Sequence, residues 1–372
     1  MQGVNDLLRL MVEQNASDLF FSPDFPLHIK IDGVIHPVNE RPLTVDNVQQ
    51  LANAVMNEGQ RRSFAQVPEM NLGLSITGLG RFRVNIFRRC GVIAVVIRYL
   101  KERIPTVEEL NLPLILKDLV MRKRGLVLMV GATGVGKSTS LAAMIDHRNE
   151  NSCSHILTVE DPIEYLYRYK RSIVNQREVG IDTLSYADAL KNAMREAPDV
   201  IMIGEIRDRD TMQHAITFAE TGHLCLATLH ATNSNQALKR IINLFPDAMH
   251  SSLYMDLANN LAAIVSQRLV TCTDGKRLPA VEVLLDTVYV KDLISKGEVD
   301  ALRDVLEKNA EQGEGMQSFD QSLFSFYKRE LITAEEALAN AGSASNMNML
   351  IKLDIGDSHL EEDSVFNFNE FD

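Results

Sequence analysis

The 372-residue sequence lacks several features that define whole classes of protein. Its four cysteines lie far apart and form no CxxC pair, which argues against a disulfide frame or a zinc site and predicts free thiols in a reducing compartment. No apolar run approaches the ~20 residues that span a bilayer, and the N-terminus lacks the basic and apolar regions of a signal peptide. We therefore expect a cytoplasmic protein that contacts a membrane only through partners.

Positive charges are fewer than negative ones in this chain, with 38 Lys and Arg against 50 Asp and Glu. The formal net charge is −12, an acidic balance that argues against a dedicated nucleic-acid binder. Residues 354–372 contain seven acidic residues and no Lys or Arg, with phenylalanines interspersed. We expect this acidic tail, residues 346–372, to be disordered.

The apolar content of 45% and the length are sufficient for two or three globular domains. In residues 1–100, apolar residues repeat at helical spacing over 3–14 and 44–60 and alternate as in strands over 18–38 and 71–98. Asp32-Gly33 marks a hairpin in the first strand region. These patterns predict a small α+β domain, followed by a linker over residues 101–113.

Residues 114–345 show a different pattern, in which apolar strands alternate with helices. We predict strands at 126–130, 156–159, 200–203 and 225–229 and a helix at 186–196 that begins with a Ser185/Asp188 capping box. Residues 257–269 are a further helical candidate. This order predicts an α/β fold with a mainly parallel sheet.

A glycine-rich loop follows the first of these strands and fits the phosphate-loop pattern G-x-x-x-x-G-K-S. In such a loop, backbone N–H groups bind phosphate at the start of the next helix. Lys137 would reach the β- and γ-phosphates of ATP, and the Ser138 hydroxyl would bind Mg²⁺. The predicted nucleotide-binding residues are Gly131, Ala132, Thr133, Gly134, Val135, Gly136, Lys137, Ser138 and Thr139.

Carboxylates follow two other apolar strands. Glu205 follows the run 200–203 and has the position of a Walker B acid, a second candidate ligand for Mg²⁺. The segment 158–164 places Glu160, Asp161 and Glu164 around a proline, where an acid would orient and deprotonate the attacking water. The alternative for this segment is a solvated acidic turn.

Histidines and arginines complete the set of candidates. His223 and His230 bracket the strand 225–229, where they would hydrogen-bond the γ-phosphate or the acidic cluster, or serve only as satisfied polar groups. Arg81 and Arg83 lie on one face of an alternating strand, and Arg98 ends another apolar run. An arginine from outside the phosphate-loop domain would act as a finger on a neighbouring subunit, the alternative being a solvated strand face.

A basic and aromatic cluster lies between the acidic segment and the next strand. Aromatic side chains can stack on the bases of nucleic acid and basic ones can pair with its phosphates. The acidic net charge of the whole chain favours an exposed loop or a subunit contact instead. We therefore expect no nucleic-acid partner. The cluster comprises Tyr165, Tyr167, Arg168, Tyr169, Lys170 and Arg171.

Together these motifs, with Ser266-Gln267-Arg268-Leu269 and the residues 278–282 that follow, resemble the secretion-type ATPases and most closely the PilT/PilU family of type IV pilus retraction ATPases. The resemblance covers residues 3–342. It implies a PAS-like N-terminal domain, a RecA-like ATPase domain and a homo-hexameric ring. It also implies Glu164 as general base, Glu205 as Walker B acid, His223 and His230 as histidine-box residues, and Arg83 and Arg98 as candidate fingers.

Two departures make the chain similar to the PilU branch, which implies an accessory retraction motor. Residues 289–294 read Tyr-Val-Lys-Asp-Leu-Ile where the PilT branch has Ala-Ile-Arg-Asn-Leu-Ile, and the acidic tail is an addition. The resemblance implies an inner-membrane pilus platform protein as partner, a ring stacked on a related retraction ATPase, and a place at the cytoplasmic face of the inner membrane. Alternatives are a nucleotide-binding structural adaptor, a pilus-extension or type II secretion ATPase, and, more remotely, a helicase.

Overall fold

The structure, a computed structural model, describes residues 2–31, 33–100, 103–309 and 315–363. The chain divides into two compact units. Unit 1 comprises Met1–Ile104 with two later segments, Glu160–Arg168 and Gln176–Ala189. Unit 2 comprises the segments Pro105–Val159, Tyr169–Asn175 and Leu190–Asp372.

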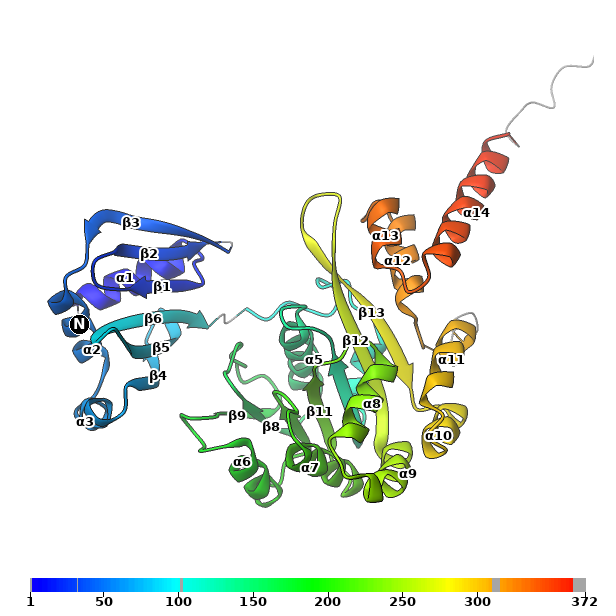
Figure 1. Cartoon of the computed structure of the whole chain (residues 1–372), viewed down its shortest axis with the longest axis horizontal. Coiled ribbons are helices and arrows are strands. Elements are labelled where there is room, and N and C mark those ends of the chain that lie inside the picture. Colours follow the sequence, from blue (N-terminus) through cyan, green and yellow to red (C-terminus); the bar gives the residue numbers. More distant parts are fainter. Residues whose placement is uncertain (1, 32, 101–102, 310–314, 364–372) are drawn as a thin grey trace, which may run out of the picture. The chain divides into compact units, whose positions relative to one another are not determined.

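Unit 1 is built on a sheet whose strand order is β3-β2-β1-β6-β5-β4, with every neighbouring pair antiparallel (Figure 1). Its core includes Leu8 and Met11 of the first helix and Phe82 of β5, all fully buried. The elements are α1 (Gln2–Glu13), β1 (Asp18–Phe21), β2 (Pro26–Ile31), β3 (Val34–Pro42), α2 (Val45–Val55), α3 (Glu58–Gln66), β4 (Glu69–Ile76), β5 (Gly80–Arg89) and β6 (Val92–Leu100).

The first prediction that needs correction is the single helix over residues 44–60. Helix α2 ends at Val55, and α3 begins at Glu58 after Asn57, whose side chain accepts from the backbone N–H of Gln60. An asparagine favours such an N-cap position, so it begins a second helix instead of continuing the first. The predicted hairpin is confirmed, since β2 and β3 pair with Ile31 opposite Val34.

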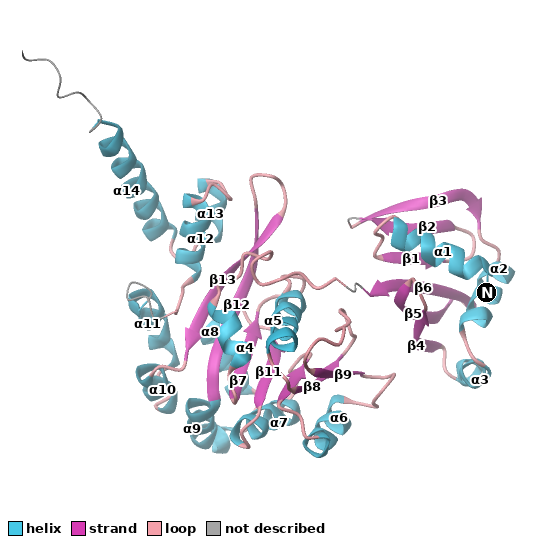
Figure 2. Cartoon of the chain, turned by 180° about the vertical axis from the view of Figure 1, so that it is seen from behind, coloured by secondary structure: helices cyan, strands magenta, loops and turns pink. Residues whose placement is uncertain are grey.

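Unit 2 contains most of a sheet whose strand order is β13-β12-β7-β11-β10-β8-β9 (Figure 2). The pairs β12–β7, β7–β11, β11–β10 and β10–β8 are parallel, whereas β12–β13 is antiparallel. The predicted α/β fold with a mainly parallel sheet is therefore confirmed. The strands are β7 (Gly125–Val130), β8 (His155–Glu160), β9 (Ile173–Glu178), β10 (Val200–Ile203), β11 (Leu224–Leu229), β12 (Leu261–Thr271) and β13 (Arg277–Leu285).

Helices connect these strands and continue to the end of the described chain. Helix α6 begins after Ser185, whose hydroxyl accepts from the N–H of Asp188 at 3.0 Å and donates to the Asp188 carboxylate at 2.6 Å, so one of the two bonds of the predicted capping box is present. The helices are α4 (Ile115–Met121), α5 (Lys137–Asn151), α6 (Tyr186–Ala193), α7 (Arg209–Glu220), α8 (Ser234–Asn243), α9 (His250–Asn260), α10 (Val288–Ser295), α11 (Leu302–Asn309), α12 (Phe319–Lys328), α13 (Ala334–Asn340) and α14 (Ala344–Asp363).

The prediction of a helix over 257–269 is wrong for most of its length. Helix α9 ends at Asn260, and residues 261–271 form β12, which lies between β7 and β13. Residues 261–267 of this strand are all buried. A fully buried strand shows a continuous apolar run, and such a run does not distinguish a strand from a buried helix.

The tail also differs from its prediction. Residues 346–363, expected to be disordered, belong to helix α14. Met347 and Ile351 are buried against Phe319, Phe326 and neighbouring apolar residues, so the start of this segment has the apolar contacts that a disordered tail lacks. Residues 364–372 lie outside the described part of the chain.

The four cysteines are free, as predicted. Among the helices in the described ranges, none is long and apolar enough to cross a membrane.

Candidate functional site

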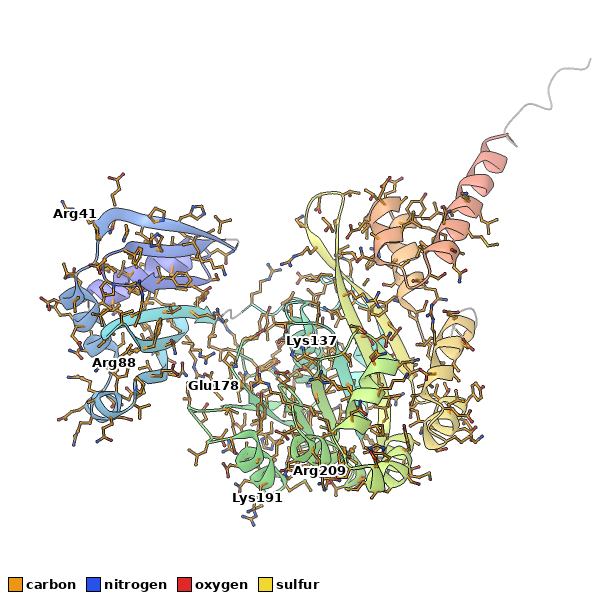
Figure 3. The ribbon with its side chains drawn as sticks, viewed as in Figure 1. Arg41, Arg88, Lys137, Glu178, Lys191 and Arg209 are labelled. Carbon is orange, nitrogen blue, oxygen red and sulfur yellow. The ribbon has the colours of Figure 1, made fainter. Side chains whose placement is uncertain are left out.

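The phosphate loop lies between β7 and α5, as predicted, and Lys137 begins the helix (Figure 3). Its ammonium group donates to the carbonyl oxygens of Gly131 at 2.7 Å and Ala132 at 2.8 Å. Gly136 precedes the helix with φ +88°, a left-handed conformation that favours glycine. The loop therefore curls around the Lys137 ammonium group at the positive end of a helix dipole, which suits it to bind phosphate.

Glu205 lies in a short loop after β10 that backbone hydrogen bonds hold on both sides. The N–H of Gly204 donates to the carbonyl of Val159 at 2.7 Å, and the N–H of Ile206 donates to Thr228 at 2.9 Å. Strands β7, β10 and β11 are parallel, so the residues that follow them lie at one edge of the sheet. The structure thus brings the loop of Glu205, the phosphate loop and His230 to the same edge.

Both oxygens of the Glu205 carboxylate have a partner. His230 Nε2 lies 2.7 Å from Oε1, and Arg207 Nε lies 2.7 Å from Oε2. The Glu205 side chain is 17% exposed, so solvent or a ligand still reaches it. Arg207 was not identified from the sequence, because sequence spacing does not show which way a loop side chain points.

His223 and His230 are not brought together. His223 precedes β11 and His230 follows it, so the two lie at opposite edges of the sheet. Seven steps of about 3.3 Å each, from residue 223 to residue 230, separate them by roughly 23 Å. The His223 ring lies 3.0 Å from Thr221 Oγ1 and 3.2 Å from the Phe218 carbonyl oxygen, as a satisfied polar group would.

The candidate arginines of unit 1 share one face of its sheet. Arg83 on β5 pairs in register with Arg98 on β6, which in turn pairs with Asp18 on β1. The neighbour Phe82 is fully buried on the other face, as alternation predicted. Arg98 Nε donates to the buried Asp18 carboxylate at 2.7 Å, so Arg98 already has a strong partner within its own unit.

Arg83 has a different kind of partner. Its Nε lies 3.6 Å from Glu178 Oε1 at the end of β9, and both atoms are buried without a hydrogen bond. The other Glu178 oxygen accepts from the backbone N–H of Ile163 at 3.3 Å. Burial raises the pKa of the Glu178 carboxyl, against the opposing effects of the Ile163 hydrogen bond and the charge of Arg83.

Glu164 lies in the same unit as Arg83 and next to Ile163. Its side chain is exposed, as a residue that must reach water or substrate would be. The acidic segment 160–164 is held by its ends, since the Glu160 carbonyl accepts from Val179 N–H at 2.9 Å and Ile163 is bound by Glu178. The fixed segment thus presents Glu164 to solvent.

The basic and aromatic cluster is partly neutralised within the chain. Lys170 Nζ lies 3.0 Å from Asp146 Oδ2 and 3.5 Å from Glu150 Oε2. Tyr169 is 80% exposed. Residues 168–171 are therefore exposed, whereas Tyr165 and Tyr167 are half-buried, and Lys170 is paired to two carboxylates.

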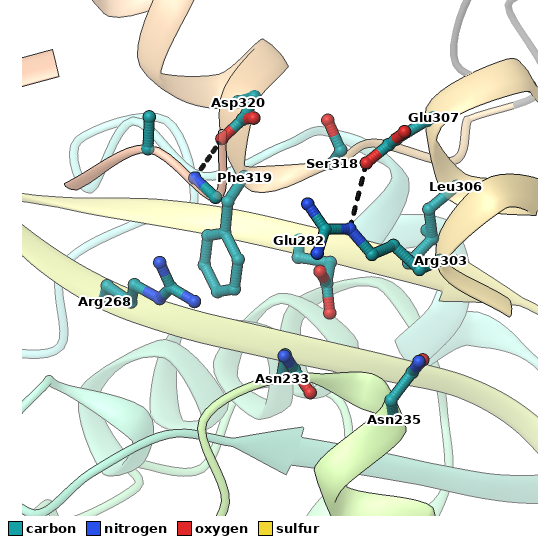
Figure 4. A pocket seen from close by; sticks show the side chains of 12 residues that line it. Asn233, Asn235, Arg268, Glu282, Arg303, Leu306, Glu307, Ser318, Phe319 and Asp320 are labelled. Atoms are coloured by element: carbon teal, nitrogen blue, oxygen red, sulfur yellow. Dashed lines mark hydrogen bonds and ion pairs between the residues drawn. The ribbon is translucent and has the colours of Figure 1, made fainter. Parts of the chain in front are cut away.

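Unit 2 also contains a pocket of about 320 Å³ that no sequence motif indicated (Figure 4). Two arginines line it: the Arg268 guanidinium lies 3.9 Å from the centre of the Phe319 ring, and Arg303 Nε lies 3.1 Å from Glu307. Three carboxylates also line the pocket, so positive and negative charges are mixed and their sign does not indicate a class of ligand. The lining residues include Asn233, Asn235, Glu282, Ser318 and Asp320.

Comparison with a family model gives a match over most of the chain. The model described as type II/IV secretion system protein matches residues 1–333. A protein of Pseudomonas aeruginosa named type IV pilus ATPase PilU is 54% identical over 348 residues, which cover 93% of this chain and 91% of that protein.

Two further comparisons agree with this match. The type IV pilus retractation ATPase PilT of Pseudomonas aeruginosa is 37% identical over 343 residues, or 92% of this chain and 99% of that protein. Among solved structures, a crystal structure of the pilus retraction motor PilT with bound ADP aligns with a TM-score of 0.84 and 37% identity. That alignment covers 92% of this chain and 97% of the solved one.

Proposed function

Because the chain belongs to the type II/IV secretion system protein family, as its motifs predicted, we propose that it is an Mg²⁺-dependent ATPase that powers retraction of a type IV pilus. The observation that carries the proposal is the phosphate loop between β7 and α5, with Glu205 and His230 at the same edge of a parallel sheet. The similarity of the chain to proteins named as type IV pilus ATPases supports the assignment to pilus retraction.

The residues of unit 2 supply the groups that bind the nucleotide and its ion. The N–H groups at the start of α5 and the Lys137 ammonium group neutralise the β- and γ-phosphates. Ser138 is exposed beside Lys137, and Glu205 keeps part of its carboxylate accessible, so these two offer the oxygen ligands that Mg²⁺ prefers. The bound ion would offset negative charge on the transferring phosphate.

The groups for the hydrolytic step are assigned as follows. Glu164 orients the attacking water and accepts its proton, since its exposed carboxylate lies on a fixed segment. His230 holds Glu205 in place and is positioned to respond to the γ-phosphate. Arg83, rather than Arg98, serves as the finger on a neighbouring subunit, because Arg98 is bound to Asp18.

A finger that acts between subunits requires an assembly. We assign the protein to a homo-hexameric ring at the cytoplasmic face of the inner membrane, acting on a pilus platform protein. Its role is that of an accessory motor stacked on a related retraction ATPase, because the chain has the features of the PilU branch. Residues 1–100 would form the PAS-like domain and residues 114–345 the RecA-like ATPase domain.

Complementation between two inactive variants tests both the chemistry and the ring. Lys137→Ala subunits retain Arg83, and Arg83→Gln subunits retain Lys137, so a mixed ring contains some complete sites. We expect each variant alone to hydrolyse ATP poorly and the mixture to exceed the mean activity of the two. In a dilution series, the activity per subunit should rise with protein concentration as the ring forms. An intact, ATP-bound wild-type ring without turnover in the presence of Mg²⁺ would overturn the proposal.

A further inference from the structure

The side chain of Gln267, on β12, lies against the phosphate loop. Strand β12 runs parallel to β7 with Ser266 opposite Val130, so Gln267 comes beside Gly131, where the loop begins. Gln267 is only 2% exposed, although a glutamine is usually at the surface. A buried amide is expected to have specific hydrogen-bond partners.

Both ends of the Gln267 amide have such a partner. Nε2 donates to the carbonyl oxygen of Val135 at 2.5 Å, and Oε1 accepts from the Ser140 hydroxyl at 2.8 Å. A carbonyl only accepts, so the amide nitrogen has to face Val135 and the orientation of the amide is fixed. Ser140 lies in the first turn of α5. The two hydrogen bonds of Gln267 therefore connect the loop, through Val135, and the helix, through Ser140, to β12.

The carbonyl of Val135 and the N–H of Gly136 belong to one planar trans peptide and point in opposite directions. Because Gln267 holds the carbonyl toward β12, the Gly136 N–H is turned away from β12. The N–H groups at this position, just before the helix, are those that bind phosphate in a loop of this kind.

The two glycines that define the motif both lie against Gln267. A Cβ atom on Gly131 would lie 2.6 Å from the Gln267 carbonyl oxygen, closer than such atoms approach. A Cβ atom on Gly136 would lie 3.1 Å from Gln267 Nε2. The contact at Gly131 is with the backbone of β12, which any residue at position 267 would make, whereas the contact at Gly136 is with the Gln267 side chain itself.

We propose that Gln267 is a positioning residue, which orients the Val135–Gly136 peptide so that its N–H binds the β-phosphate of the nucleotide. This inference depends on the proposed function, because it requires that the loop binds a nucleotide. It extends that function by assigning a role to a residue outside the phosphate loop. Gln267 does not contact the reacting atoms, and its effect on nucleotide binding is indirect.

The experiment measures the dissociation constants of ADP and AMP, by displacement of a fluorescent ADP analogue, for the wild type and for Gln267→Met. Methionine has a similar length and lacks both hydrogen bonds. Because AMP has no β-phosphate, we expect ADP to bind about 10-fold or more weakly while AMP binding stays within about twofold. Gln213→Met, on the exposed face of α7, is the matched control and should bind both nucleotides as the wild type does.

Ser140→Ala provides a second, milder variant, because it removes the hydrogen bond from α5 to the Gln267 amide and leaves the one to Val135. We expect the same selective loss of ADP affinity at a smaller size, and unfolding of each variant without nucleotide monitors the fold. If Gln267→Met does not fold, Ser140→Ala alone decides. Unchanged ADP affinity, or an equal loss for ADP and AMP, would overturn the role of Gln267. A wild type that binds no ADP would instead overturn the proposed function.

Discussion

The two units of this chain hold their functional charges differently. In unit 2, both oxygens of Glu205 have a partner at 2.7 Å, and backbone hydrogen bonds hold the residues on either side. In unit 1, Arg83 and Glu178 lie 3.6 Å apart, and the two facing atoms are buried without a hydrogen bond. Short, charge-assisted bonds hold a group in one position, whereas a long, buried pair gains little to offset its desolvation.

This difference suggests separate tasks for the two units. A Walker B acid has to be in position before the nucleotide arrives, because reorganisation during the reaction would reduce its effect. An arginine finger, by contrast, has to leave one partner for another. The loose pairing of Arg83 with Glu178 is what such an exchange requires, and Arg98, bound at 2.7 Å to Asp18, lacks this freedom.

The largest expected effect comes from Lys137 in unit 2. We expect Lys137→Ala to lower steady-state ATP hydrolysis about 10³-fold or more, because its ammonium group neutralises charge that develops on the phosphates. Lys191→Ala, on α6, is the matched control and should keep wild-type turnover. Turnover of Lys137→Ala within tenfold of the wild type would contradict the assignment of the loop.

The next effect tests the looser pair of unit 1. We expect Arg83→Gln to lower turnover about 10²-fold and Arg98→Gln to lower it much less, since Arg98 is already bound by Asp18. Both are measured at saturating ATP and at concentrations where the ring is intact. Arg62→Gln, on the exposed surface of α3, is the control for loss of one positive charge. Equal losses for Arg83 and Arg98 would remove the distinction between them.

The buried carboxyl of Glu178 makes stability depend on pH. Burial raises its pKa in the folded protein above the ordinary 4.5, so the folded state binds this proton more tightly than the unfolded chain does. Its contribution to stability is therefore present below pH 4.5 and is lost as the pH rises through the raised pKa. Asp182, Arg81 and Arg83 are the charged groups that act on it.

The measurement compares the free energies of unfolding of the wild type and Glu178→Gln in urea, from pH 4.5 upward. We expect the wild type to lose stability relative to the variant as the pH rises and the difference to become constant above the raised pKa. A difference that grows in favour of the wild type over this range would mean that Arg83 stabilises the ionised carboxylate more than burial opposes it.

The smallest expected effect concerns an exposed ion pair with the same separation as Arg83 and Glu178. Arg62 and Glu58 also lie 3.6 Å apart, but their side chains are 76% and 83% exposed, against 22% and 2% for Arg83 and Glu178. We expect Glu58→Gln to leave the unfolding midpoint within the replicate scatter at every pH, because water screens exposed pairs. A shift as large as that of Glu178→Gln would show that burial is not the cause of the difference.

Local patterns predicted many of the elements and failed at identifiable places. The phosphate loop, the strand before Glu205 and the N-cap Ser185 of α6 depend on residues close in sequence, and all were found as expected. Residues 261–269 have the pattern of a buried helix in the sequence because a strand buried on both faces is apolar throughout. The prediction already placed His223 and His230 at the two ends of one strand, and β11 separates them in that way, so only His230 lies at the same edge as the phosphate loop.

By itself, the sequence determined that a phosphate-loop motif joins a strand to a helix and that an acid follows the strand 200–203, because both signals are short and local. Only the tertiary structure decided which distant groups meet these residues. Strand order brings Gln267 to Val135 and Ser140, and the fold of unit 1 brings Glu178 to Arg83. Such contacts depend on how strands pair, and a single sequence does not encode that pairing in any local pattern.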